Sequence, residues 1–144
     1  MNRICVLFIC TGNSARSQMA EALLKKYGNS RFEVYSAGFD PGKINPYAKR
    51  VMKEIGMDMI GQYSKNIDVY IRKKRFNYLI TLCSNAEKLC PGVFPGIGEK
   101  LHWPFEDPTA FIGSESETLE RFREIRDQIE KRIKSWLEEQ DKED

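Results

Sequence analysis

The chain has 144 residues, of which 41% are hydrophobic and 31% charged, and its formal net charge is +2. This length predicts one domain with its own core, and an aromatic content of 11% excludes a disordered chain. No apolar run reaches the roughly 18 residues that a membrane span needs, so we expect no membrane association. The start of the chain lacks the pattern of a secretion signal, and we therefore expect a cytoplasmic protein.

The charges are unevenly distributed along the chain. Residues 1–114 carry six more basic than acidic side chains, whereas residues 115–144 carry four more acidic than basic ones. The dense basic run at 72–75 has no interleaved aromatic residues and is typical of a solvated surface, so we expect no nucleic-acid partner. Four cysteines are too few for a disulfide scaffold, which favours thiols kept for chemistry or packing in a reducing compartment.

Apolar runs and amphipathic stretches alternate along the chain. The first run is continuous, as in a strand buried on both faces of a parallel sheet. One helix is predicted to end at residues 28–29, and a second to begin at Asn45 and Pro46, an N-cap followed by proline. This alternation predicts a doubly wound α/β sheet. The predicted strands are residues 3–10, 32–37, 77–83 and 100–103.

The last predicted helix is the longest. Ser114 and Glu117 fit a capping box, and apolar residues from Leu119 to Leu137 recur at steps of three and four. We expect the acidic tail, residues 138–144, to fray. The whole chain, residues 1–144, is predicted to form a single domain.

Residues 10–17, CTGNSARS, connect the first strand to the first helix, where the ligand site of a doubly wound sheet is expected. Backbone N–H groups at a helix N-terminus bind anions, and the planar fork of Arg16 is suited to a tetrahedral oxyanion. Gly12 is predicted to take the positive φ that such a loop needs, and Ser17 to donate to the Cys10 sulfur. A Cys and an Arg at this spacing are weak evidence alone, but the flanking strand and helix strengthen it. The predicted oxyanion-binding residues are Thr11, Gly12, Asn13, Ser14, Ala15, Arg16 and Ser17.

The segment CTGNSARSQMAEALL resembles the phosphate loop and first helix of the low-molecular-weight tyrosine phosphatase fold. The arsenate reductases of that fold are similar over about residues 3–137, including NPYAKRVMKEIGMD, LITLCSNAEKLCP and LHWPFEDP. The resemblance implies a four-stranded parallel sheet of flavodoxin-like order with flanking helices. It also implies that Cys10 is the nucleophile, that Asn13 orients the loop, that Arg16 binds the oxyanion and that Asp107 is the general acid. Glu106 is the alternative acid, although Pro108 rigidifies the backbone and favours Asp107.

Cys83 and Cys90 are seven residues apart, with a predicted short helix at 84–89 between them. Seven helical residues rise about 10.5 Å, whereas a disulfide needs Cα atoms within about 7 Å. The pair therefore cannot oxidise unless this segment unwinds. Packing roles for both cysteines are the alternative, which the neighbouring Cys10 loop disfavours.

Reduction of arsenate to arsenite takes two electrons, which two thiols supply when they form one disulfide. The resemblance therefore implies a relay from Cys10 to Cys83 to Cys90 that uses no bound cofactor. Thioredoxin is the electron donor that three thiols imply, and a glutathione or glutaredoxin route, used by some relatives, is the alternative. The expected partners are thus an arsenate or phosphate oxyanion and thioredoxin, and we expect a monomer.

Two other functions remain open. The first is a low-molecular-weight protein tyrosine phosphatase, in which Cys83 and Cys90 serve packing or redox protection. Thr109 and Ala110 disfavour it, because tyrosine phosphatases of this fold typically place aromatic residues there. The second is a redox sensor or a cysteinyl phosphocarrier. Arg16 and Asp107 argue against a carrier, which has no use for a general acid, and a pure sensor would not need an oxyanion-binding loop.

No metal site is expected. Some relatives bind potassium beside the loop through residues equivalent to Asn13, Glu21 and Ser36 and through an aspartate, but Lys65 stands at the position of that aspartate. Its ammonium would take the place of the ion. Of the remaining candidates, His102 is expected to make a structural hydrogen bond and Cys5 to lie in the core.

Overall fold

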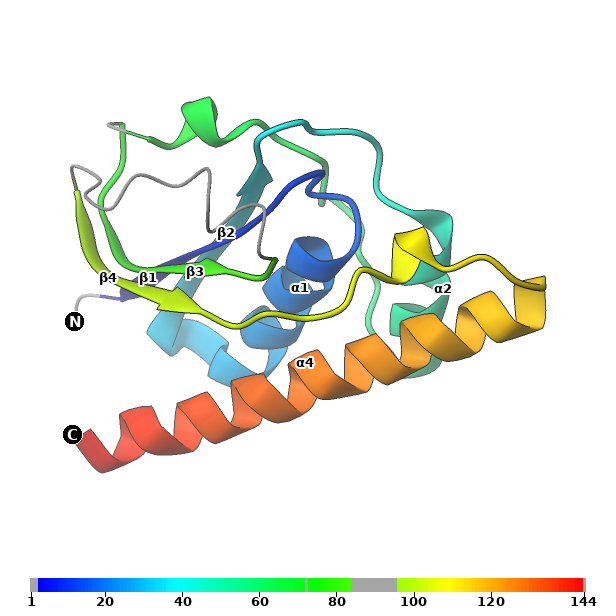
Figure 1. The fold of residues 1–144 in the computed structure, drawn as a ribbon. Helices are drawn as coiled ribbons and strands as arrows, with labels where there is room; N and C mark the ends of the chain where they lie inside the picture. The colour runs from blue at the N-terminus through cyan, green and yellow to red at the C-terminus, as the bar shows by residue number, and fades with distance from the viewer. Residues whose placement is uncertain (1–2, 72, 84–95, 144) are drawn as a thin grey trace.

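The computed structural model describes residues 3–71, 73–83 and 96–143. Its strands form one parallel sheet in the order β2-β1-β3-β4, with β1 and β3 in the middle (Figure 1). This arrangement confirms the expected four-stranded parallel sheet of flavodoxin-like order with flanking helices. The strands are β1 (Ile4–Cys10), β2 (Phe32–Gly38), β3 (Phe76–Thr81) and β4 (Ile97–His102).

Three α-helices contribute to the core on one face of the sheet: α1 (Arg16–Gly28), α2 (Pro46–Glu54) and α4 (Glu115–Glu143) (Figure 1). Side chains of a strand alternate between the two faces. Phe8 of β1 therefore packs in the core formed with these helices. Leu7 and Ile9 face the other side, where Ile67, in a short 3₁₀ helix (Ile67–Val69), covers them. No helix in the described part of the chain is long and apolar enough to cross a membrane.

The predicted helix starts are confirmed by their hydrogen bonds. Asn45 Oδ1 accepts from the backbone N–H of Tyr47 at 2.8 Å, so Asn45 caps α2. At α4, Ser114 Oγ accepts from the Glu117 N–H at 3.1 Å, and Glu117 Oε1 accepts from the Ser114 N–H at 3.2 Å. These two bonds make the capping box expected from the sequence.

The C-terminal segment differs from its prediction, because α4 remains helical through Glu143. The expectation that the acidic tail frays is therefore wrong for residues 138–143. Gln140 continues the buried stripe one turn beyond Trp136, and it accepts a hydrogen bond from the Tyr78 hydroxyl at 3.3 Å. Asp141 forms an ion pair with Arg31 at 2.5 Å. These contacts with the body of the domain hold the last turns of the helix.

The fourth strand also differs, since it begins at Ile97, three residues before its predicted start. It lies at the edge of the sheet, and most of its side chains are exposed or half-buried. An edge strand of this kind lacks the hydrophobic alternation that identifies a strand from sequence. The prediction therefore found only its more apolar end.

Candidate active site

The carboxyl ends of β1, β3 and β4 lie at one edge of the parallel sheet (Figure 1). The predicted site residues Cys10, Arg16, Cys83 and Asp107 line one cavity there. Beyond the regular strands, the backbone N–H of Leu82 donates to Ile9 O at 2.9 Å, and the N–H of Phe105 donates to Leu82 O at 3.0 Å. Ile9 and Leu82 are therefore hydrogen-bonded to each other, and each is followed directly by a cysteine, Cys10 and Cys83 respectively. Asp107 lies two residues after Phe105, in the segment that follows β4 and is bonded to Leu82 at this edge of the sheet.

A cavity of about 410 Å³ opens at this edge. Its wall includes the expected nucleophile Cys10, the second thiol Cys83, the Arg16 guanidinium and the expected acid Asp107. Asn13 and Ser17 are fully buried behind it. Cys90 and the predicted helix at 84–89 lie outside the described residues. The lining residues are Cys10, Thr11, Gly12, Ser14, Ala15, Arg16, Cys83, Asp107 and Thr109.

A short hydrogen-bonded chain leads to the Cys10 sulfur. Asn13 Nδ2 donates to Ser17 Oγ at 2.8 Å, and Ser17 Oγ lies 2.9 Å from Cys10 Sγ. The Ser17 oxygen accepts from Asn13, which leaves the Ser17 hydroxyl proton available for donation to the sulfur. A hydrogen bond donated to sulfur favours the thiolate, the form that acts as a nucleophile. The predicted role of Ser17 thus agrees with this geometry.

Asn13 bonds to residues outside the loop, as a loop-orienting residue would, and it also has the backbone conformation that we expected at Gly12. Asn13, and not Gly12, has the positive φ, at 50°. Asparagine tolerates this conformation when its polar groups are satisfied locally. Here the Asn13 side-chain oxygen accepts from Gln18 Nε2 and from the Lys65 N–H, both at 2.9 Å, while its backbone oxygen accepts from Ser64 Oγ at 2.8 Å. The assignment of this backbone role to Gly12 was wrong.

Gln18, Ser64 and Gly38 support the loop, and the sequence reasoning missed all three. Gln18 is a polar residue on α1 with no exposed surface, so it serves buried polar groups. Its burial is visible in the structure and not in the sequence. Gly38 ends β2, where a Cβ atom would lie 2.5 Å from Thr11 O and 2.9 Å from the Asn13 nitrogen. A side chain at Gly38 would therefore displace the loop.

Arg16 and Asp107 face each other across the cavity. Arg16 Nη1 donates to Phe105 O at 2.9 Å, and Arg16 Nη2 lies 3.6 Å from Asp107 Oδ2. Glu106, the alternative acid, does not line the cavity and instead pairs with Arg121 of α4 at 3.5 Å. The geometry therefore favours Asp107 as the acid.

The second thiol lies next to the oxyanion loop. Cys83 Sγ is 3.5 Å from Thr11 Oγ1, and the residue is only 6% exposed. Thr11 is adjacent to Cys10 in the chain, so two buried thiol groups share one cavity with the loop that is expected to bind an oxyanion. This arrangement allows thiol chemistry on a bound oxyanion.

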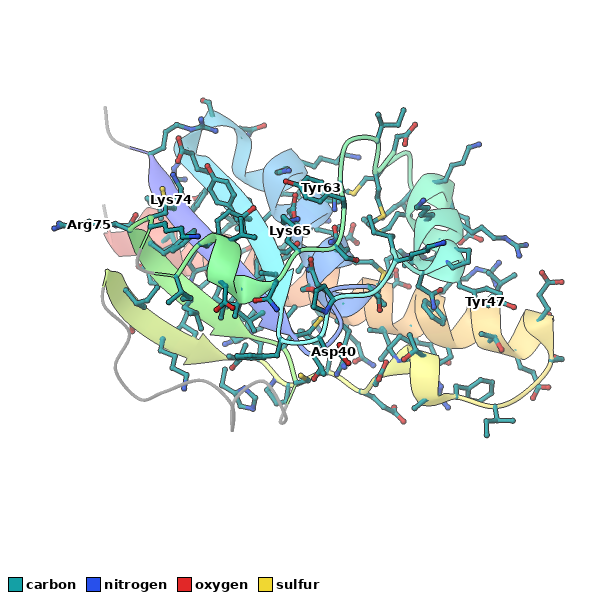
Figure 2. All side chains as sticks on the ribbon, turned by 90° about the horizontal axis from the view of Figure 1, so that it is seen from above. Asp40, Tyr47, Tyr63, Lys65, Lys74 and Arg75 are labelled. Carbon is teal, nitrogen blue, oxygen red and sulfur yellow. The ribbon has the colours of Figure 1, made fainter. Side chains whose placement is uncertain are left out.

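A buried cation lies behind the loop, where Lys65 and Tyr63 are close to each other (Figure 2). Lys65 Nζ donates to Tyr63 O at 2.6 Å and lies 4.0 Å from Glu21 Oε1. The same Glu21 oxygen accepts from Ser36 Oγ at 2.5 Å, and Lys25 pairs with Oε2 at 2.6 Å. Burial lowers the pKa of Lys65, and the Glu21 carboxylate opposes that effect. Glu21 and Ser36, which are equivalent to potassium ligands of some relatives, are thus already engaged, and this residue set does not fit the ion.

Cys5 and His102 lie apart from this cavity. Cys5 Sγ donates to Glu33 Oε2 at 3.1 Å near the start of β1, and burial together with this carboxylate raises the pKa of the thiol. Cys5 is half-buried, so its predicted core position is correct only in part. His102 Nδ1 is 2.8 Å from Thr81 Oγ1, which is the kind of structural contact that we expected.

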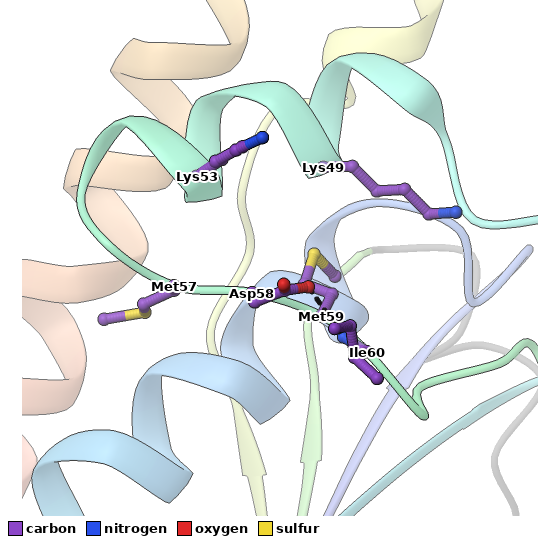
Figure 3. Close-up of a pocket in the computed structure, with 6 residues that line it drawn as sticks. All are labelled: Lys49, Lys53, Met57, Asp58, Met59 and Ile60. Carbon is purple, nitrogen blue, oxygen red and sulfur yellow. Dashed lines mark hydrogen bonds between the residues drawn. The ribbon is translucent and has the colours of Figure 1, made fainter.

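Two other surface features are remote from Cys10. Lys74 and Arg75 of the basic run precede β3 and lie at the end of the sheet away from Asp40 (Figure 2). A second cavity, of about 210 Å³, lies beside α2 (Figure 3). It shares no lining residue with the site at Cys10. Its lining residues are Lys49, Lys53, Met57, Asp58, Met59 and Ile60.

Comparison with known proteins gives one consistent result. The low molecular weight phosphotyrosine protein phosphatase family matches residues 5–144. An arsenate reductase of Halalkalibacterium halodurans is 44% identical over 138 residues, which are 96% of this chain and 98% of that protein. An arsenate reductase of Bacillus subtilis is 40% identical over the same length and the same shares of both chains.

Solved structures agree with this result. An arsenate reductase in the phosphate-binding state is similar with a TM-score of 0.76 and 30% identity, over 94% of this chain and 98% of that one. A thioredoxin-dependent arsenate reductase of Corynebacterium glutamicum is similar with a TM-score of 0.71 and 29% identity, over 95% of this chain and 61% of that one.

Proposed function

The chain belongs to the low-molecular-weight phosphotyrosine protein phosphatase family, and within it we propose that the protein is an arsenate reductase. One observation carries this choice over a phosphatase: Cys83 lies in the same cavity as Cys10 and contacts the oxyanion loop through Thr11. Hydrolysis of a phosphate ester needs a single thiol, because water resolves the thiophosphate. Reduction needs a second thiol at the site.

The first step is attack of the Cys10 thiolate on arsenate. The loop amides and Arg16 hold the oxyanion, a sulfur–arsenic bond forms, and one arsenate oxygen leaves as water after Asp107 protonates it. Ser17 Oγ, 2.9 Å from the Cys10 sulfur, is placed to donate a hydrogen bond to it during the attack. Arsenic remains As(V) at this stage.

The electrons move in the second step. Cys83 attacks Cys10 Sγ, a disulfide forms, and the sulfur–arsenic bond breaks with its electron pair remaining on arsenic, which leaves as arsenite. Cys90 then attacks Cys83, and Cys10 departs as a thiolate. Two thiols have been oxidised to the Cys83–Cys90 disulfide and one As(V) has been reduced to As(III), so the electrons balance.

The proposed electron donor is thioredoxin, which reduces the Cys83–Cys90 disulfide without any bound cofactor. The resemblance to a thioredoxin-dependent arsenate reductase supports this donor. A glutathione or glutaredoxin route is the alternative. Turnover with purified thioredoxin and its reductase, compared with turnover with glutathione and glutaredoxin, distinguishes them.

Incubation of the reduced protein with arsenate alone is expected to leave a Cys83–Cys90 disulfide and a free Cys10 thiol. The relay ends there when no donor is present, since nothing reduces the final disulfide. Alkylation followed by mass mapping of the four cysteines measures this state. Incubation with phosphate is the matched control, because phosphate fills the same loop without accepting electrons. Complete alkylation of all three relay thiols after arsenate would contradict the proposal.

Potassium is expected to leave the turnover rate within about twofold of the rate in sodium at equal ionic strength. The Lys65 ammonium supplies the positive charge beside Glu21, so no ion is needed there. Steady-state rates in the two salts measure the effect, and Lys65→Asp, which restores the carboxylate that some relatives have, is the comparison variant. A strong preference of the unsubstituted chain for potassium would refute the role of Lys65.

A further inference from the structure

We propose that Thr109 is a positioning residue that fixes the orientation of the Asp107 carboxyl group in the reaction. This inference rests on the proposed function, in which Asp107 is the general acid. Thr109 is exposed and lines the cavity together with Asp107.

Two hydrogen bonds connect Thr109 to a single carboxyl oxygen. Asp107 Oδ1 accepts from the Thr109 backbone N–H at 3.0 Å and from Thr109 Oγ1 at 2.6 Å. The other oxygen, Oδ2, has a different environment, 3.6 Å from Arg16 Nη2. The carboxyl group therefore has one oxygen held by Thr109 and one directed at the group that binds the oxyanion.

This asymmetry determines where an acidic proton resides. An oxygen that already accepts two hydrogen bonds is a poor position for a proton, because the proton would oppose both donors. The proton of the acid form is therefore placed on Asp107 Oδ2. That oxygen faces the oxyanion side, where the departing arsenate oxygen needs protonation.

The side-chain hydroxyl of Thr109 is the part of this arrangement that a substitution can remove. The terminal torsion of an aspartate is broad, so one backbone N–H restrains the carboxyl less than two donors do. Thr109→Val keeps the shape of the residue and its N–H but loses the hydroxyl, whereas Thr109→Ser retains the hydroxyl. Neither change touches Cys10, Arg16 or the loop amides.

The test compares chemistry with binding in the full-length reduced protein. Single-turnover production of arsenite from arsenate measures the chemistry, and the dissociation constant for inorganic phosphate measures the loop. We expect Thr109→Val to slow arsenite production about tenfold, a part of the ~10²–10⁴-fold that a positioned acid supplies. Phosphate affinity stays within about twofold, because the acid does not hold the anion.

Three further variants make the result decisive. Thr109→Ser is expected to restore the rate to within about twofold of the unsubstituted chain. Thr118→Val removes a hydroxyl that donates to Ser114 O at 2.8 Å on α4, and it is the matched control with an unchanged rate. Asp107→Asn is expected to slow arsenite production by about 100-fold or more.

The failures are distinguishable. If Asp107→Asn slows the reaction and Thr109→Val does not, the role of Thr109 is refuted and the proposed acid stands. If Thr109→Val weakens phosphate binding as much as it slows the reaction, or if Thr109→Ser fails to restore the rate, positioning through Asp107 is likewise refuted. If Asp107→Asn leaves the rate unchanged, the proposed acid itself is wrong and the inference fails with it.

Discussion

Cys83→Ser is expected to abolish arsenite production and to leave any hydrolysis of p-nitrophenyl phosphate within about twofold of its original rate. In the proposed mechanism, phosphoryl transfer uses Cys10, the loop amides and Arg16, none of which the change removes. Reduction stops at the sulfur–arsenic adduct, because a serine hydroxyl cannot form a disulfide with Cys10. Arsenite is quantified in a single turnover, and nitrophenol release is measured in steady state.

Cys5→Ser is the matched control for this experiment. Cys5 is a thiol in the same sheet. It lies near the start of β1, bonds to Glu33 and does not line the cavity. Its replacement should leave both activities in place. Loss of both activities together in Cys83→Ser would contradict the division of labour between the two thiols.

Arg16→Lys is expected to lower kcat/KM for arsenate reduction by roughly 10²–10³-fold, the cost of removing one preorganised donor to an oxyanion. The guanidinium bonds Phe105 O through Nη1, and Arg16 lines the cavity. A planar guanidinium can in addition offer a fork of donors to the proposed oxyanion. A lysine ammonium retains the charge but cannot bond Phe105 O and hold the proposed oxyanion at the same time. Steady-state kinetics with arsenate and calorimetric binding of phosphate measure the change.

Arg50→Lys provides the control for charge and side-chain type. Arg50 pairs with Glu115 on the surface at 2.7 Å and takes no part in the cavity. We expect its activity to stay within about twofold of the original. Normal phosphate binding together with normal turnover in Arg16→Lys would show that the fork geometry is unnecessary.

The parts of the site that the sequence predicts well are those that follow from local chain geometry. A buried strand, a short loop and a helix place amides around Cys10 wherever they occur in this order, and the pairing of β1 with β3 brings Cys83 beside them. Asp107 follows the fourth strand in the same way. Position at the end of a parallel strand is sufficient to predict the loop at Cys10, whereas the roles of Cys83 and Asp107 were implied by the resemblance to arsenate reductases of this fold.

The parts that the sequence missed depend on contacts between distant segments. Asn13, and not Gly12, takes the positive φ because Ser64 and Lys65 bond to it across about fifty residues, and no local pattern encodes that pairing. The tail beyond residue 137 is helical because Gln140 and its neighbours contact the body of the domain. The local composition predicts a solvated acidic end, because it carries no information about the distant partners Tyr78 and Arg31.

The bonds between Asn13 and the segment that carries Ser64 and Lys65 also affect when, during folding, the surroundings of the proposed nucleophile Cys10 are completed. The sequence separations are 51 and 52 residues, and β2 and α2 lie between the bonded positions. Contacts of this range form only after much of the chain has ordered, because the loop-closure entropy must be overcome first. The Asn13 side chain then directs the Ser17 proton to the sulfur. A partly folded chain therefore lacks the hydrogen-bonded arrangement around Cys10, and the proposed anion-binding site arises together with the completed fold.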